Sequence, residues 1–152
     1  MPRAPAQRGM TLLVSLVFLL LLTLLGISSM NNATLQEKMS TSVRLRNQSF
    51  QMAEAALRAG ETAVQATGYT LAVCASPCAL PLSGQVAAAG TDASGATWVS
   101  ANNGFYTVQN LGTTTDAVNV TPAGTSATLY RVTAAGIVGT SRSVVESIYA
   151  KY

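Results

Sequence analysis

The dominant pattern in the chain is a long run of apolar residues close to its first residue. Between Met10 and Met30 most residues are Leu, Val, Ile, Phe or Met, and no charged residue occurs between Arg8 and Glu37. A helix needs about 20 apolar residues to cross the hydrocarbon core of a bilayer. The pattern therefore predicts a helix over 10–30 that inserts into a membrane.

The residues after this run predict that the helix continues with a different character. Residues 31–66 contain no Pro and a single Gly, Gly60, and they are rich in Ala, Leu, Met, Gln, Glu and Arg. These residue types favour helix, and apolar positions recur at spacings of three and four. We expect an amphipathic helix that ends near Ala66 and packs one apolar stripe against a sheet, through Phe50, Leu57 and Val64.

The composition changes after Gly68, where Gly, Ser, Thr, Val and Tyr replace the helix formers. Residues 82–97 are typical of a loop. Residue types and alternation predict about four antiparallel strands, over 97–100, 104–111, 127–135 and 143–149. A turn is expected within 136–142. The sequence thus predicts an α+β fold, in which a long N-terminal helix packs against a small antiparallel sheet.

Charge and composition exclude several classes of function. The net charge is +3, and Arg3 and Arg8 before the apolar run supply two of the positive charges. The remaining chain is close to neutral and lacks the basic stripe that nucleic acid binding needs. No His is present, which removes the commonest general base and metal ligand. Without a Gly-rich phosphate loop, a nucleophile elbow or a carboxylate pair, we expect neither an enzyme nor a cofactor.

The two cysteines, Cys74 and Cys78, are candidates for a small disulfide. Positive residues before an apolar helix favour an N-terminus that stays in the cytoplasm. Residues after Met30 would then lie outside the cytoplasm, where disulfides persist. Free thiols are the alternative, while a zinc site would need further ligands.

Polar and aromatic residues of the distal part have plain structural explanations. Asp92 and Asp116 lie in expected loops and could bind calcium, but isolated acidic residues are usually solvated. The aromatic residues could form an adhesive surface, although packing in the core is the more common role. They are Trp98, Phe105, Tyr106 and Tyr130.

Three interpretations compete for the N-terminal segment. A secretory signal peptide has a shorter apolar core and a small-residue cleavage site, and only Gly26-Ile27-Ser28 resembles one weakly. A simple signal anchor is also compatible with the pattern. The third interpretation uses Arg8-Gly9, which precedes the apolar run directly, as in a prepilin.

The residues beyond the apolar run carry a more specific resemblance. The block 46–61 reads Arg-Asn-Gln-Ser-Phe-Gln-Met-Ala-Glu-Ala-Ala-Leu-Arg-Ala-Gly-Glu, and 33–39 reads Ala-Thr-Leu-Gln-Glu-Lys-Met. With Arg8-Gly9-Met10, these blocks make the chain similar to PilX-type minor pilins of type IV pili. The last 25 residues resemble that family moderately, and the middle of the chain hardly resembles it.

The resemblance implies a processing site and a division of the chain. A prepilin peptidase would cut between Gly9 and Met10, remove the basic leader 1–9 and leave Met10 to be N-methylated. Residues 10–30 would form the transmembrane and filament-core helix, 31–66 its amphipathic continuation, and 67–152 a globular domain. The protein would sit in the inner membrane with a cytoplasmic N-terminus and a periplasmic domain, and later in the pilus. Other minor pilins and the major pilin would be its partners.

The chain departs from the pilin pattern at the fifth position of the expected mature protein. Most pilins carry Glu there, and in this chain the position is Val14. In the family, that Glu is thought to compensate the charged N-terminus of a neighbouring subunit. A subunit without it packs poorly beneath others, because a buried charge needs a partner. The resemblance therefore favours a role in initiating or capping the pilus near its tip, in support of twitching motility and adhesion. A type II secretion pseudopilin and an unrelated single-pass anchor are the alternatives.

Overall fold

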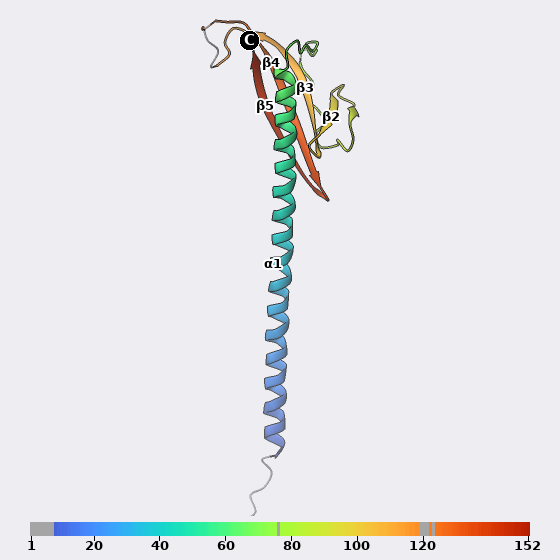
Figure 1. Cartoon of the computed structure of the whole chain (residues 1–152). Helices are drawn as coiled ribbons and strands as arrows, with labels where there is room; N and C mark the ends of the chain where they lie inside the picture. The colour runs from blue at the N-terminus through green and yellow to red at the C-terminus, as the bar shows by residue number, and fades with distance from the viewer. Residues whose placement is uncertain (1–7, 76, 119–121, 123) are drawn as a thin grey trace, which may run out of the picture. The chain divides into compact units, whose positions relative to one another are not determined.

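The computed structural model describes residues 8–75, 77–118, 122 and 124–152. Contacts divide the chain into two units, which meet between Ser42 and Val43. The first unit is helical in its described residues. The second unit combines the end of the helix with all the strands (Figure 1), and we call it the head.

The single helix, α1, spans Arg8–Gln65. It therefore covers both the apolar run and the amphipathic segment, as the sequence predicts, and ends one residue before the expected Ala66. The predicted division at residue 30 leaves no break in the helix. Ser28, Asn31 and Asn32, which weaken helices in isolation, are helical here.

The strands form one antiparallel sheet in sequence order, β1-β2-β3-β4-β5. Their bounds are Gly90–Thr91 for β1, Thr97–Ala101 for β2, Gly104–Thr114 for β3, Ala127–Val138 for β4 and Ser141–Lys151 for β5. The predicted α+β class and the four predicted strands are confirmed. The prediction missed β1, which lies in the expected loop 82–97, because two residues carry no alternation that a sequence pattern can show.

One face of the sheet packs on the head part of α1. Ala53, Ala56 and Val64 of the helix are fully buried, and Val64 contacts the buried Tyr130 and Val132 of β4. The two elements approach so closely that side chains are excluded at some positions. A Cβ atom on Gly60 would lie 2.6 Å from a methyl group of Val132. The core on this face thus depends on small residues as much as on apolar ones.

This close approach corrects part of the predicted packing. Val64 is buried and Leu57 packs against the core as expected, but Phe50 is 46% exposed. The inward position of that turn belongs to Ser49, which is fully buried. The backbone of β4 at Gly136 runs so near the backbone of Ser49 that a Phe side chain directed there has no room. The apolar stripe alone therefore misplaced the inner face by one residue.

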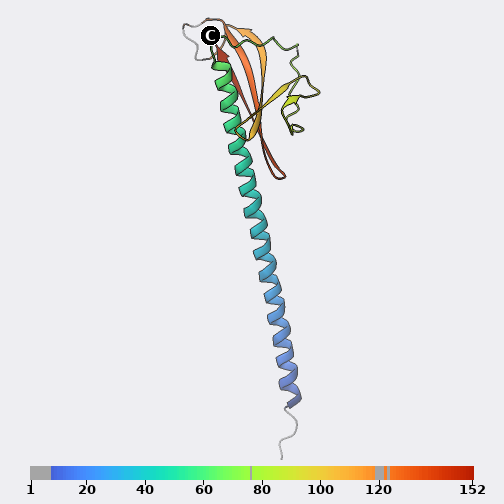
Figure 2. The ribbon, with the colours of Figure 1, turned by 45° about the vertical axis from the view of Figure 1, so that its right-hand side comes forward.

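The opposite face of the sheet is covered by the segment between the helix and β2 (Figure 2). A second, smaller core forms there from the buried Val86, Trp98 and Ala135, with Phe105 partly buried against them. Trp98 is 2% exposed and Tyr130 is 4% exposed. These two aromatic residues pack inside the head, and neither belongs to an adhesive surface.

The last strand also closes the end of the helix. The ammonium group of Lys151 donates hydrogen bonds to the carbonyl oxygens of Val64 at 2.9 Å and Ala66 at 2.8 Å. It lies 5.8 Å from the ring centre of Tyr69. A cation suits this position, because the final carbonyls of a helix lack backbone partners and carry partial negative charge.

Candidate assembly helix and head surface

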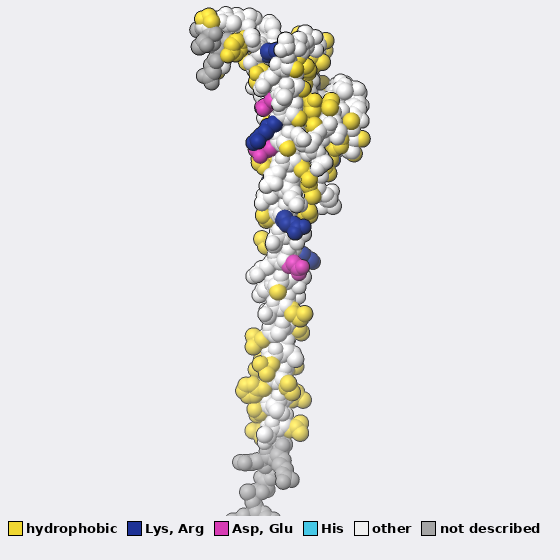
Figure 3. Space-filling view, viewed as in Figure 1, with side chains coloured by type: hydrophobic (Ala, Val, Ile, Leu, Met, Phe, Trp, Pro, Cys, Tyr) yellow, Lys and Arg dark blue, Asp and Glu magenta, His cyan; other side chains and the backbone are white. Residues whose placement is uncertain are grey.

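The apolar part of α1 leaves its side chains open to the surroundings. Those described between Met10 and Met30 are all exposed, with Leu25 at 68% and Phe18 at 62%. In Figure 3 this part of the helix carries hydrophobic side chains and no charged ones in the view shown. By length and composition the helix could cross a membrane. Exposed apolar surface of this extent marks a membrane or protein interaction site.

Polar groups within the apolar part are satisfied by the helix itself. The hydroxyl groups of Ser15 and Thr23 donate hydrogen bonds to the carbonyl oxygens of Leu12 and Leu20, each at 2.8 Å. Internal pairing of this kind lowers the cost of placing hydroxyl groups in an apolar medium.

The expected processing site lies at the beginning of α1. Arg8 and Gly9 are the first two helical residues, and Met10 is 69% exposed. Residues 1–7 of the expected leader lie outside the described residues. Val14 is 47% exposed. Four residues after Met10, it therefore presents an isopropyl group where most pilins present a carboxylate.

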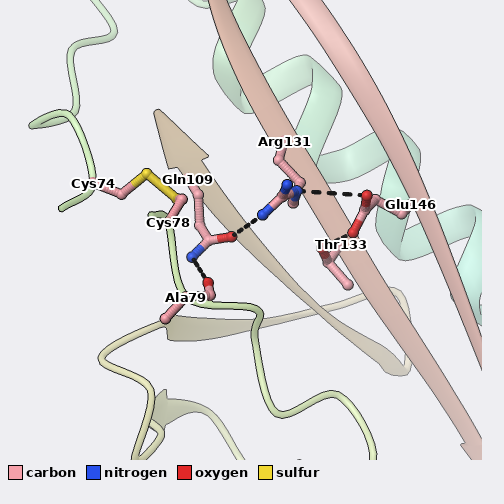
Figure 4. A network of polar contacts seen from close by, with 7 residues as sticks. All are labelled: Cys74, Cys78, Ala79, Gln109, Arg131, Thr133 and Glu146. Carbon is pink, nitrogen blue, oxygen red and sulfur yellow. Dashed lines mark hydrogen bonds and ion pairs between the residues drawn. A yellow bond between two sulfur atoms is a disulfide. The ribbon is translucent and has the colours of Figure 1, made fainter. Parts of the chain in front are cut away.

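In the head, a disulfide joins Cys74 and Cys78 and holds the segment that follows the helix. The backbone N–H of Cys74 donates to the carbonyl oxygen of Asn110 at 2.9 Å. The side-chain amide of Asn110 donates to the carbonyl of Leu71 at 2.7 Å, and that of Gln109 donates to Ala79 at 2.8 Å. The disulfide loop is thereby attached to β3 on both sides (Figure 4).

A polar network extends from this attachment across the sheet (Figure 4). Arg131 of β4 donates to Gln109 of β3 at 3.3 Å, and its Nε lies 3.5 Å from a carboxylate oxygen of Glu146 of β5. The hydroxyl of Thr133 donates to the other oxygen of Glu146 at 3.2 Å. The network joins three strands and ties the disulfide loop to them. Its groups are engaged with one another, so we assign it a structural role.

Asp92 organises the loop that covers the second core. Its carboxylate accepts hydrogen bonds from the backbone N–H groups of Leu82 at 2.9 Å, Ser94 at 2.8 Å and Ala96 at 3.1 Å. It also accepts from the Ser94 hydroxyl and from the Trp98 indole, the latter at 2.9 Å. The sequence Asp-Ala-Ser-Gly is typical of a turn that an Asp side chain closes, and this signal could have revealed the role.

These hydrogen bonds set the ionisation of Asp92. Burial opposes the charged form, but the hydrogen bonds from Ser94, Trp98 and the backbone of Leu82 outweigh it and hold the pKa of the carboxyl well below its usual range. Both carboxylate oxygens are already engaged by protein groups. No group of three or more Cys, Asp or Glu side chains that could hold a metal ion occurs within the described part of the chain.

We expect Asp92→Asn to lower the free energy of unfolding of the head by about 1–2 kcal/mol, because an amide cannot accept all these hydrogen bonds. The folded-state pKa lies below the unfolded one. The stabilisation is therefore present above the ordinary Asp pKa and is lost as the pH falls toward the folded value. Urea unfolding of the full-length protein in detergent, followed by the fluorescence of its single Trp, measures both effects.

Asp116→Asn is the matched control, because Asp116 is exposed. We expect this substitution to change the free energy of unfolding by less than about 0.5 kcal/mol. If the two variants show equal stability from pH 7 down to pH 4, the assigned role of Asp92 is wrong.

The fold and the exposed apolar helix define a pilin-like class of protein: one long N-terminal helix packed, in the head, against a five-stranded antiparallel sheet. Within this class, residues 8–58 match the family model described as PilX N-terminal. The match supports the resemblance to PilX-type type IV pilins over the first part of the chain. No curated protein and no solved structure matches the chain.

Proposed function

We propose that this protein is a minor pilin, a structural subunit that helps to initiate or cap a type IV pilus. The match of residues 8–58 to the PilX N-terminal family carries the proposal. The exposed apolar helix supports it, because the same surface suits both a bilayer and a bundle of similar helices. In this mechanism α1 anchors the subunit in the inner membrane, then leaves the bilayer and packs against neighbouring pilin helices.

The proposal includes processing and topology. A prepilin peptidase removes residues 1–9 on the cytoplasmic side, and the new N-terminus at Met10 is methylated. The head lies in the periplasm before assembly, a compartment that maintains a disulfide such as Cys74–Cys78. The other minor pilins and the major pilin are the partners, and the subunit contributes to twitching motility and adhesion through the filament.

Val14 supports a position at or near the tip. A subunit inside the shaft must compensate the charged N-terminus of a neighbouring subunit within an apolar bundle, and burying such a charge alone is costly. The apolar part of α1 has no carboxylate before Glu37. The subunit therefore fits best where no neighbour requires that compensation.

Gold labelling of an epitope-tagged subunit tests the role and the position together. We expect labels on sheared surface filaments, confined to one end. The substitution Val14→Glu is expected to move a measurable fraction of labels into the shaft, because the new carboxylate can pair with a neighbouring N-terminus. Electron microscopy of filaments from both strains gives the distribution of labels.

Ser15→Glu is the matched control, since it adds the same charge one position away. We expect no redistribution of its labels along the shaft. Even labelling of wild-type shafts would contradict the tip position. A wild-type subunit that stays in the cell envelope and is absent from all surface filaments would favour a type II secretion pseudopilin instead.

A further inference from the structure

The head has a groove between α1 and the beginning of β5 that the proposed function does not use. Its lining comes from one turn of the helix and from the first residues of the last strand, and its volume is about 490 Å³. The lining residues are Arg46, Asn47, Phe50, Arg142, Ser143 and Val144. Two of the six carry a positive charge, and none carries a negative one.

The two arginines differ in how they are held. Arg142 is partly buried and donates a hydrogen bond from Nη1 to the carbonyl oxygen of Ser83 at 2.9 Å, which fixes its guanidinium group. Arg46 is exposed on α1, and no carboxylate of the described residues forms an ion pair with it. A fixed cation and an adjustable one therefore face the same groove. Guanidinium groups favour carboxylate partners, which they can bind with two parallel hydrogen bonds.

The neutral polar part of the groove is already organised by the fold. The hydroxyl of Ser143 lies 2.7 Å from the hydroxyl of Ser49, which is fully buried beneath it. This hydroxyl pair holds the first residues of β5 against the helix, so the floor of the groove does not depend on a ligand for its position.

Apolar side chains complete the groove. Phe50 is 46% exposed and Val144 is 42% exposed, although both are large hydrophobic residues. Phe50 is also the residue that the helical pattern assigned to the core. An exposed aromatic ring beside arginines is typical of protein interaction surfaces. The groove thus combines cations with apolar surface, which suits a peptide more than a bare anion.

We propose that this groove binds an acidic segment of another protein subunit, with its carboxylates on Arg46 and Arg142 and an apolar side chain between Phe50 and Val144. The charge complementarity of the lining carries the proposal. The choice of a neighbouring filament subunit as the source rests on the proposed function. Nucleic acid fits less well, because two arginines beside apolar residues do not form the extended basic track that a phosphate backbone requires.

Binding of a model peptide to the purified full-length protein in detergent tests the groove. The probe is a fluorescein-labelled peptide of sequence Glu-Leu-Glu-Leu-Glu, and fluorescence anisotropy gives its Kd. We expect saturable binding. In the double variant Arg46→Gln, Arg142→Gln we expect it to weaken by about tenfold or more, since two charge-assisted contacts are lost. Phe50→Ala should also weaken binding, by about threefold or more, through loss of apolar contact.

The controls separate this groove from general attraction to a basic protein. Arg44→Gln removes an exposed arginine of the same helix that does not line the groove, and its Kd should match that of the wild type. The peptide Gln-Leu-Gln-Leu-Gln should bind at least about tenfold more weakly. Equal loss of affinity in Arg44→Gln, or full displacement of the peptide by 10 mM inorganic phosphate, would overturn the proposal.

The outcome is independent of the proposed function. Peptide binding is measured on the purified chain, so a protein absent from filaments can still show a specific acidic-peptide groove. Conversely, a labelled subunit on pili whose purified form does not bind the probe up to millimolar concentration would refute the groove and leave the pilin assignment intact.

Discussion

The substitution Gly136→Val is expected to prevent the head from folding. A Cβ atom at this position would lie 2.0 Å from the carbonyl oxygen of Ser49 and 2.5 Å from the backbone nitrogen of Ala53. Both are backbone atoms in the middle of α1, so they cannot move without separating the helix from the sheet. Overpacking usually costs about 1–3 kcal/mol, and we expect more than about 3 kcal/mol here because the obstacle is rigid.

The measurement is urea unfolding of the full-length protein in detergent, with Trp98 as the probe. A domain of this size has a total stability of about 5–15 kcal/mol, so the expected loss removes much of it. Gly84→Val is the matched control, because a Cβ there meets no atom within 4 Å. Its free energy of unfolding should stay within about 0.5 kcal/mol of the wild type. If the Gly136 variant unfolds at the same urea concentration as this control, the helix does not approach the sheet as closely as described.

The second large effect is expected at the processing site. Wild-type protein from the membrane fraction should begin at Met10 and carry one additional methyl group. Gly9→Val should retain residues 1–9 and leave filaments without detectable subunit. Glycine at this position allows the peptide backbone to approach a catalytic centre without a side chain in the way, and valine blocks that approach. Intact mass and N-terminal sequencing distinguish the two forms directly.

Ala4→Val serves as the control for this experiment, since it enlarges a leader residue away from the expected cut. Its mature mass should equal that of the wild type. A wild-type chain that still begins at Met1, in cells with an active prepilin peptidase, would rule out both the pilin and the pseudopilin interpretations and leave the simple anchor.

Much of the fold could be predicted because its signals are local. A helix of 58 residues follows from an uninterrupted series of helix formers with no Pro, and an apolar run without charges stands out in any window. The strands β3, β4 and β5 are long, and the alternation of Tyr130, Val132 and Ala134 correctly gives one buried face of β4.

The errors arise where backbone contacts decide. Phe50 follows the apolar period, yet the closeness of Gly136 to Ser49 turns a serine inward instead. No window of the sequence contains that fact, because the two residues lie in different elements. Gly136 itself was expected within a turn, whereas the structure ends β4 at Val138 and uses only two residues, Gly139 and Thr140, to reach β5. A glycine that permits close packing has the same sequence appearance as one that permits a turn.

The candidate groove shows the same limit. Arg46 and Arg142 are distant in the sequence, and only the pairing of β5 with β4 brings Arg142 to the helix side of the molecule near Asn47. Sequence reasoning counted both arginines as part of a nearly neutral remainder. Their combination with an exposed Phe50 becomes visible only when the three-dimensional arrangement is known.

The position of Lys151 has a consequence for the order of events during synthesis. Its ammonium group closes the end of α1 through Val64, at a sequence separation of 87 residues, and only one residue follows it. The ribosome therefore releases the helix cap almost last. While the chain is being made, the end of α1 remains uncapped and the sheet lacks its final strand. The nascent protein can hold only its helix formed, and the head reaches its final state after the whole chain has been delivered.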